Sequence, residues 1–317
     1  MKTSFVAIGF LLLTACSSTP SNDTIFIISQ DELNQLKLSY YSDYFSFVGW
    51  DENGAVAFAL DNNRGQDGNS WQAEHFVVLF DEQSGWQAPQ GNGAYDNLDR
   101  KLSAIPDSDY FTFKGTPAIG FEIDSQLNKL NLKTAPIKTI IDNKQGLSKY
   151  RLGSAEATLL WNNREIKGRV IHEHLFLPAF NRLTRSYMGV FDDFHGIYAA
   201  VDKTGDFYFH SQKSDFLAPL TGYDEGFLVL NGDAIPLTEF SINTDERKQA
   251  LGFYRWPMRW TGAFHGSNAD YQFELNLHQK NNIANWVIGG FSMGIVNGEL
   301  NTKNRVMKIF GLGELII

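Results

Sequence analysis

The chain contains very little cysteine: Cys16 is the only one among 317 residues. A single thiol excludes an internal disulfide and a zinc site built from clustered cysteines. The sequence also lacks a Gly-x-Ser-x-Gly elbow, a phosphate-binding loop and a dinucleotide fingerprint. We therefore expect no covalent catalysis by serine or cysteine, and no cofactor.

Basic residues are in the minority, with 27 lysines and arginines against 36 aspartates and glutamates, a formal net charge of -9. Such an acidic chain is a poor ligand for nucleic acid, and we expect no nucleic-acid partner and no electrostatic docking on anionic lipid. No apolar run reaches the ~18 residues that a membrane-spanning helix needs. A content of 43% hydrophobic and 14% aromatic residues is ample for a packed core.

The first sixteen residues contain a pattern typical of secretion. Lys2 precedes an apolar run from Phe5 to Leu13, which has the length of a signal peptide and is too short to span a bilayer. The ending Leu-Thr-Ala-Cys16 resembles a bacterial lipobox, in which the cysteine becomes the first mature residue and is acylated. The alternative is an ordinary signal peptide with an accidental cysteine.

We therefore predict a lipoprotein signal peptide over residues 1–15 and a flexible tether, rich in serine, threonine and proline, over residues 16–25. Ser17 follows the cysteine, which in lipoproteins of this kind favours the outer membrane. The predicted location is the outer membrane, on either face, with acyl chains that bury methylene groups at ~0.8 kcal/mol each.

Hydrophobic residues alternate with a period of two over most of the remaining chain. The run 45–50, an Asn-Gly turn and the run 55–60 predict a β-hairpin, and many similar short segments follow. This pattern predicts an all-β sandwich or barrel. The alternation lapses at 142–146, so we expect the boundary between two β units there. The first unit comprises residues 26–145 and the second residues 146–317.

Helix signals are scarce. Ser29 and Glu32 form a Ser-x-x-Glu capping box ahead of apolar residues at helical spacing that reach Tyr40. The segment Thr244–Leu251 predicts another helical turn or two. We therefore expect few and short helices.

Two Glu-His dipeptides, one in each predicted β unit, are the main candidates for chemistry. Glu173 and His174 lie within a predicted strand, while Glu74 and His75 follow Trp71 after a loop rich in glycine, asparagine and aspartate. A carboxyl group beside an imidazole can donate and accept protons. Because adjacent strand residues face opposite ways, we expect only one of Glu173 and His174 to point into a cavity.

His172 and His174 also stand at positions i and i+2 on one face of the same predicted strand. They could hold a metal if His195 or Asp193 supplied a third ligand. The spacing is not that of the helical His-Glu-x-x-His pair, and histidines satisfied by neighbouring groups are the simpler interpretation. We therefore predict no metal.

The run from Phe253 to Trp260 alternates arginine with tryptophan. Trp256 and Arg259 could seat a guanidinium group on an indole ring and close one end of a barrel. The alternative is a half-buried strand whose arginines extend along it to solvent.

Three segments resemble the lipocalin-like family that contains carotenoid hydratase (hydroxyneurosporene synthase). The family pattern Gly-x-Gly-Tyr-x-Glu-His-x-Trp-Gly is similar to Gly168–Phe176, and its Tyr-Pro-x-Arg-Trp strand is similar to Arg255–Trp260. Its closing Gly-Tyr-x-Glu-Leu resembles Gly311–Leu315. Val170 stands where the family has its second glycine, and Leu175–Leu177 replaces the Trp-Gly region. The resemblance covers the second half of the chain, and the first half only by strand pattern.

The resemblance implies two lipocalin-like β units packed together, in a family that includes hydratases and cyclisation catalysts. The function we expect first is an outer-membrane lipoprotein that binds an apolar small molecule, such as a lipid or isoprenoid, in a β cavity. The alternative is a cofactor-independent hydratase, isomerase or cyclase that uses acid catalysis on such a molecule. A third function is an interaction lipoprotein whose aromatic residues only fill the core.

The predicted site is a barrel mouth. In an enzyme, Glu173, His174 and Glu74 would carry the acid chemistry, because an apolar wall can raise the pKa of a carboxyl group until it protonates carbon. The ligand would contact four further residues: Trp71, His75, Trp256 and Arg259.

The lipid anchor is testable by a single substitution. Cys16→Ser removes the only thiol that could be acylated, so we expect the protein to move from the membrane fraction to the soluble periplasm or to remain unprocessed. Fractionation and immunoblotting measure this. Normal processing together with unchanged membrane association would rule the anchor out.

Overall fold

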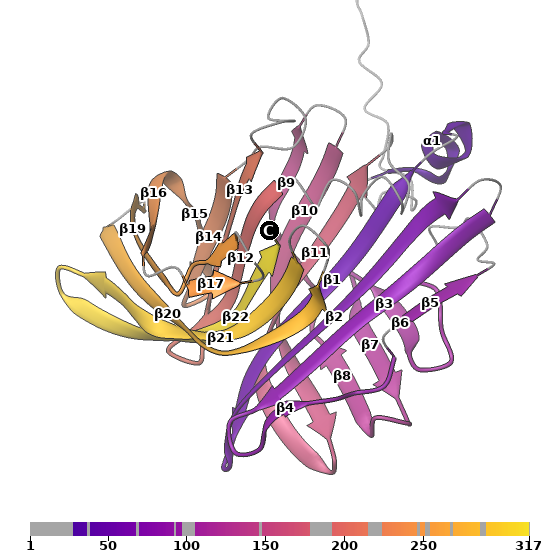
Figure 1. Ribbon diagram of the computed structural model, residues 1–317, viewed down its shortest axis with the longest axis horizontal. Coiled ribbons are helices and arrows are strands. Elements are labelled where there is room, and N and C mark those ends of the chain that lie inside the picture. Colours follow the sequence, from indigo (N-terminus) through magenta and orange to yellow (C-terminus); the bar gives the residue numbers. More distant parts are fainter. Residues whose placement is uncertain are drawn as a thin grey trace, which may run out of the picture.

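The structure, a computed structural model, describes residues 28–36, 39–67, 70–91, 93–96, 105–145, 148–177, 192–214, 224–245, 248–250, 254–266, 269–285 and 290–316. Within these residues the chain is almost entirely antiparallel β-strand, which confirms the predicted all-β class. Figure 1 shows two curled sheets packed side by side, the second in orange and yellow. Cys16 lies outside the described residues.

The first sheet has the strand order β4-β3-β2-β1-β11-β10-β8-β7-β6, with β5 beside β3 and β9 beside β10. Its strands are β1 (Tyr40–Asp51), β2 (Gly54–Asp67), β3 (Ser70–Asp81), β4 (Gly85–Gln87), β5 (Gly93–Asp96), β6 (Thr112–Thr116), β7 (Gly120–Ser125), β8 (Leu130–Thr134), β9 (Lys138–Gln145), β10 (Ser148–Trp161) and β11 (Arg164–Leu177). The first and last strands of this half, β1 and β11, therefore lie side by side in its middle.

The second sheet has the order β15-β14-β13-β12-β22-β21-β20-β19-β16, again with its first strand beside its last. Its strands are β12 (Asp192–Val201), β13 (Gly205–Ser214), β14 (Asp224–Leu230), β15 (Asp233–Pro236), β16 (Thr238–Asp245), β19 (Arg259–His265), β20 (Asp270–Asn285), β21 (Gly290–Thr302) and β22 (Arg305–Ile316). A separate pair consists of β17 (Lys248–Ala250) and β18 (Tyr254–Trp256). The two sheets confirm the expected pair of lipocalin-like units.

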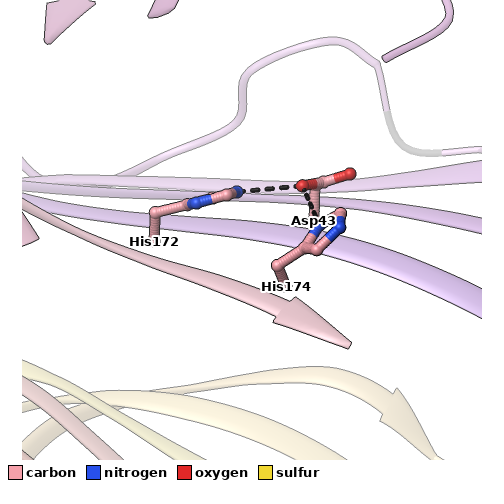
Figure 2. Close-up of side chains that lie close together, drawn as sticks. All are labelled: Asp43, His172 and His174. Carbon is pink, nitrogen blue, oxygen red and sulfur yellow. Dashed lines mark hydrogen bonds and ion pairs between the residues drawn. The ribbon is translucent and has the colours of Figure 1, made fainter. Parts of the chain in front are cut away.

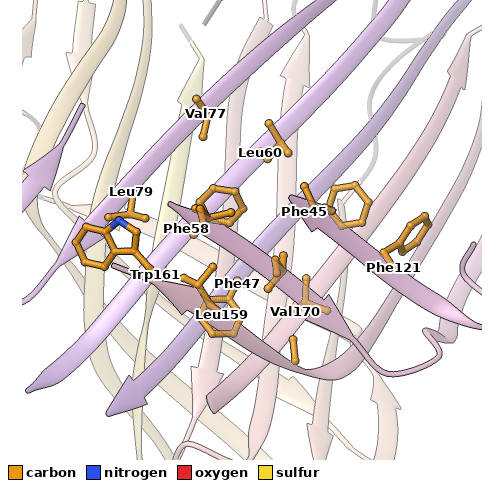
Figure 3. Close-up of a cluster of buried hydrophobic side chains, with 14 of the residues drawn as sticks. Phe45, Phe47, Phe58, Leu60, Val77, Leu79, Phe121, Leu159, Trp161 and Val170 are labelled. Carbon is orange, nitrogen blue, oxygen red and sulfur yellow. The ribbon is translucent and has the colours of Figure 1, made fainter. Parts of the chain in front are cut away.

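The period-two pattern places alternate side chains on the two faces of each sheet. On β1, Phe45 and Phe47 face the concave interior of the first sheet, where they pack against Phe58, Phe121 and Val170. Figure 3 shows this apolar interior. The second sheet has an interior of its own, built from the residues Ile197, Ala199, Val201, Phe207, Phe209, Leu228, Leu237, Trp260, Phe264, Tyr271, Phe273, Leu275, Leu277, Val296, Leu300, Met307, Ile309 and Leu315.

The opposite faces of the two sheets meet in a third buried layer, which we call the seam. Its buried hydrophobic residues are Tyr40, Tyr44, Val48, Ala57, Ala59, Val78, Phe80, Tyr150, Leu152, Ile171, Leu175, Tyr198, Ala200, Tyr208, Phe227, Val229, Met293, Ile295 and Leu312. The two β units are therefore joined by a continuous core and are not separately packed domains.

The strand pairing divides the chain later than the predicted boundary at 145/146. The segments β10 and β11 pair with β8 and β1, so the first sheet extends to Leu177 and the second begins at Asp192. The lapse in alternation at 142–145 falls within β9, which pairs with β10 in the first sheet, so it marks no boundary between the sheets.

The one helix among the described residues, α1 (Gln30–Gln35), begins at the predicted capping box, in which Ser29 accepts a hydrogen bond from the backbone N–H of Glu32. It is shorter than its apolar spacing suggests, because Leu36 is extended and Tyr40 opens β1. The further helical turn expected from Thr244 onward is wrong, since the described residues there belong to β16 and β17. No described helix is long and apolar enough to cross a membrane.

An ion pair crosses the seam between the sheets. The Nε atom of Arg169 on β11 donates to Oδ2 of Asp206 on β13 over 2.7 Å, and Asp206 is 1% exposed. Burial raises the pKa of Asp206 to about 6, although Arg169 and a hydrogen bond from Ser154 oppose the rise. The desolvation of the carboxylate thus outweighs its partner.

This pair predicts a pH-dependent stability. The folded-state pKa of Asp206 of about 6 lies above its value of about 3.9 in an unfolded chain, so the folded state binds more protons between these values. The free energy of unfolding should therefore fall by an amount on the order of 2 kcal/mol as the pH rises from about 4 to about 6. Urea unfolding measures it.

Two variants isolate this contribution. Asp206→Asn should lack that part of the pH slope, whereas Asp202→Asn, at the exposed pair with Arg305, should retain it. An identical slope in the wild type and Asp206→Asn would contradict the assignment.

Candidate functional site

The pairing of β1 with β11 sends the two members of the Glu173-His174 dipeptide to opposite sides of the first sheet. His174 is opposite Asp43 and faces the concave interior, together with His172 and Phe45. Glu173 is opposite Tyr44 and faces the seam. One dipeptide therefore contributes to two separate polar clusters, back to back across β11.

The first cluster, which we call the interior network, consists of Tyr41, Asp43, Arg64, His172 and His174. Oδ1 of Asp43 accepts hydrogen bonds from Nε2 of His172 over 2.9 Å and from Nδ1 of His174 over 2.6 Å (Figure 2). The guanidinium group of Arg64 forms an ion pair with Oδ2 of the same carboxylate. Asp43 has no measurable exposure, so each of its partners is needed to offset the cost of burying a charge.

The charge states in the interior network follow from these contacts. Burial acts to raise the pKa of Asp43, but His174, Arg64 and the two imidazole hydrogen bonds outweigh it and hold the pKa well below its usual range. Burial lowers the pKa of His174 despite the opposing effect of Asp43, so this imidazole is neutral near pH 7. Nδ1 of His174 therefore carries the proton given to Asp43, and Nε2 accepts from the hydroxyl of Tyr41.

Tyr41 is enclosed on every side. The guanidinium carbon of Arg64 lies 4.4 Å from the centre of its ring, and Ile28, Leu33 and Phe176 pack around it under helix α1. Burial raises the pKa of Tyr41 well above its usual value, so the phenol keeps its proton. The interior network is thus closed between the apolar interior and the helix.

The second Glu-His dipeptide divides in the same way. His75 on β3 faces the interior, where it contacts the Asn62 side chain and the hydroxyl of Ser108 at 3.1 Å. Burial, with the nearby cation of Arg64, lowers the pKa of His75 to about 4, so it is neutral. Through the register of β3, β2, β1 and β11, it stands in one row with Asn62, Asp43 and His174.

Asp43, His172 and His174 are the described group whose spacing could hold a metal ion, with candidate ligand atoms within 4.8 Å of one another. From the sequence, His195 or Asp193 was a possible third ligand, but both belong to β12 in the second sheet. The chemistry of the group does not favour an ion, because both imidazole N–H groups already donate to one carboxylate oxygen. A divalent cation there would also face the charge of Arg64 in a buried site.

The second cluster lies in the seam around Glu173. The hydroxyl of Tyr198 on β12 donates to Oε2 of Glu173 over 2.9 Å, a contact between the two sheets. Tyr44 packs on Tyr198 with ring centres 4.8 Å apart, and Tyr198 packs on Tyr208 at 5.1 Å. Glu173 and Glu314 are half-buried, so this part of the seam is reached from solvent.

Further polar groups continue the row of phenols. The hydroxyls of Tyr150 on β10 and Tyr208 on β13 lie 2.8 Å apart, and that of Tyr208 lies 3.1 Å from Nδ1 of His210. Burial raises the pKa of Tyr198 well above its usual value, with further contributions from Glu173, Tyr208, Glu314 and Tyr44. The seam therefore holds protonated phenols beside a carboxyl group at one end and an imidazole at the other.

The remaining predicted residues lie elsewhere. Glu74 shares the seam-facing side of the first sheet with Glu173, but β1 and β2 intervene and the two positions are offset by two residues along the strands. Their separation is about 16 Å at the usual strand spacing and rise. Arg259 lies on β19 and forms an ion pair with Glu274 over 2.9 Å. Trp256 belongs to β18 in the separate strand pair, and Trp71 to β3. The seven residues expected at one mouth are thus distributed over different sheets and faces.

Several residues of both clusters were not anticipated. Asp43 and Tyr44 carry no motif, and their partners His174 and Glu173 are about 130 residues away along the chain. The only signal was the adjacent polar pair Ser42 and Asp43 in an otherwise mostly apolar strand. Tyr198, Tyr208 and His210 lie on two strands whose contact with the first sheet depends on how the sheets pack, which periodicity does not reveal.

No protein-family model and no curated protein sequence matches the chain. Among solved structures, a protein of Nitrosomonas europaea assigned provisionally as an AttH matches with a TM-score of 0.58 and 10% identity, covering 89% of this chain and 93% of that one. Kievitone hydratase from Nectria haematococca matches with a TM-score of 0.53 and 10% identity, covering 95% and 96% of the two chains. These likenesses show a shared fold, the two-unit lipocalin-like architecture.

The interior network should be essential for stability. Asp43→Asn leaves the buried cation of Arg64 without its counter-charge, and we expect a loss of about 3–5 kcal/mol in the free energy of unfolding. Chemical denaturation measures it. The exposed pair of His265 and Asp270 gives the control, since Asp270→Asn should cost less than about 1 kcal/mol. Equal effects of the two substitutions would show that the interior network does not stabilise the fold.

Proposed function

We propose that this protein is an enzyme that adds water to, or isomerises, a carbon–carbon double bond of an apolar small molecule by acid catalysis in the seam. Glu173 is the proposed proton donor. The observation that carries the proposal is the position of Glu173, which is half-buried, bonded to the hydroxyl of Tyr198 and beside a row of phenol rings in contact.

The chemistry fits this arrangement. In a hydration, the carboxyl group of Glu173 gives its proton to one alkene carbon, and the π electron pair forms the new C–H bond. Water adds through its oxygen to the carbocation and loses one proton, which restores the carboxyl group. In an isomerisation the carbocation loses a different proton instead. The faces of Tyr44, Tyr198 and Tyr208 can stabilise the transient positive charge by cation–π attraction.

The solved structures support this class indirectly. One of the two proteins with the same fold is described as a hydratase, kievitone hydratase. A fold hosts many activities, so the proposal depends on the groups in the seam and not on the likeness alone. The proposal differs from the predicted site in using Glu173 without His174, which faces the interior network.

A second candidate is a protein that binds an apolar ligand in the seam without transforming it. The aromatic lining favours this function equally, because apolar walls with a few polar groups are typical of small-molecule sites. In either case, attachment to the outer membrane through acylated Cys16 is part of the proposal, as the sequence predicts.

Deuterium incorporation tests the catalytic proposal. The protein is incubated in D₂O with unsaturated isoprenoids such as lycopene, squalene and farnesol, and mass spectrometry follows deuterium bound to carbon. We expect incorporation with at least one of these substrates, and Glu173→Gln should lower its rate by roughly 100-fold or more.

Glu156→Gln serves as the matched control, because Glu156 lies exposed on the neighbouring strand β10. Its rate should equal that of the wild type. Undiminished incorporation by Glu173→Gln would remove Glu173 from the reaction, and binding without incorporation would favour the second candidate.

A further inference from the structure

The hydroxyl of Tyr44 is buried and has no hydrogen-bond partner among the described residues. Tyr44 is 5% exposed, and its ring packs against Tyr198 in the seam. A buried hydroxyl without a partner costs free energy, and native structures usually supply one from the protein, from water or from a ligand. This hydroxyl is therefore a donor placed to meet an oxygen or nitrogen atom of a bound molecule.

Carboxylates surround this donor. The register of β1 with β11 and β2 places Glu173 on one side of Tyr44 and Asp61 on the other, on the same face of the sheet. Asp61 is held as an acceptor, with Ser42 donating to one oxygen over 2.7 Å and Asn63 donating to the other over 2.6 Å. The acceptors beside Tyr44 thus bind other donors, and its hydroxyl is bonded to neither.

The electrostatic field at this point is negative. Burial raises the pKa of Tyr44 well above its usual value, and Glu314 of the second sheet, Asp61 and Glu173 add to the rise by repelling a phenolate. Arg169, which shares the seam-facing side of β11 with Glu173, pairs with Asp206 of the second sheet. An anionic group brought to Tyr44 would meet the negative charges of Glu314 and Asp61, and that of Glu173 once it has given up its proton.

We propose that the seam selects its ligand by charge: it takes an apolar molecule whose uncharged hydroxyl, carbonyl or ether oxygen accepts a hydrogen bond from Tyr44, and it rejects the corresponding carboxylate or phosphate. Tyr44 is the orienting donor, and Glu314 is a specificity-determining residue through its charge. This inference rests on the proposed function only for the place of the site, because it concerns binding and not turnover.

The negative field also has a role in the proposed reaction. Carboxylates that repel an anion attract a cation, so the same groups that exclude a fatty acid or an isoprenoid diphosphate would favour the carbocation formed after protonation. A single arrangement of charge thus accounts for both the selection of an uncharged ligand and the course of the reaction.

Three probes with the same chain and different head groups test the selection: farnesol, farnesylamine and farnesoic acid, with binding measured calorimetrically at about pH 8. We expect farnesol to bind the wild type through Tyr44 and farnesylamine, a cation at this pH, to bind through the attraction of the carboxylates. Farnesoic acid should bind at least about tenfold more weakly than farnesol. Glu314→Gln should strengthen binding of farnesoic acid by about threefold or more and leave farnesol within about twofold.

Tyr44→Phe should weaken farnesol binding by about fivefold, which is the effect of one net hydrogen bond. Glu299→Gln, at the exposed pair with Lys308, and Tyr110→Phe, at an exposed tyrosine, are the matched controls and should change neither affinity. Circular dichroism of each variant checks that the fold is retained.

The outcomes separate this inference from the proposed function. Farnesoic acid binding as tightly as farnesol, farnesol failing to bind, or Tyr44→Phe binding farnesol as the wild type does would each overturn it. If farnesol binds selectively but no deuterium enters any substrate, the selection stands and the catalytic proposal fails. If deuterium is incorporated through Glu173 while farnesoic acid and farnesol bind alike, the catalytic proposal stands and the selection by charge fails.

Discussion

Both polar clusters of this protein depend on the antiparallel pairing of β1 with β11. The other nine strands of the first sheet lie between β1 and β11 in the sequence. The register of the two strands sets Asp43 opposite His174 and Tyr44 opposite Glu173. The strands approach closely because Gly49 faces Gly168, where a Cβ atom would lie 2.1 Å from the backbone oxygen of Val48. A shift of one residue in this register would move the side chains of one strand to the opposite face of the sheet and separate the residues of both clusters.

The two clusters serve different ends because they differ in access. The interior network is sealed between phenylalanines and helix α1, and each of its strong charges has a partner, Arg64 for Asp43. Such a network contributes by fixing one arrangement of strands, since breaking it would leave a charge buried. The seam cluster contains half-buried glutamates and an unpartnered phenol at Tyr44. Nε of Arg64 in the interior network also lacks a hydrogen-bond partner among the described residues, so the two clusters differ in their access to solvent and not in complete bonding.

The sequence predicted the local features and missed the long-range ones. Alternation along single strands was enough for the all-β class, the hairpin at Asn53 and Gly54 and the cap of α1, because each depends on neighbours in the chain. It was also enough to predict that Glu173 and His174 face opposite sides. The domain boundary at 145/146 was placed too early, because the polar residues just before it belong to β9, which pairs with β10 of the same sheet. Glu173 lies opposite Tyr44 and bonds to Tyr198, and both of these residues come from strands whose packing against β11 no periodicity encodes.

The three buried layers have different constraints on their side chains, which is compatible with a shared fold at low sequence identity. Each sheet has an apolar interior of its own, so either could change its side chains with only the constraint of filling its own volume. The seam is different, because Tyr44 and Glu173 come from one sheet while Tyr198 and Glu314 come from the other. No single sheet holds the cluster, and the proposed ligand would bridge both. If that proposal holds, substitutions in the seam alter which ligand is bound while the interiors preserve the architecture, which is consistent with a shared fold at 10% identity.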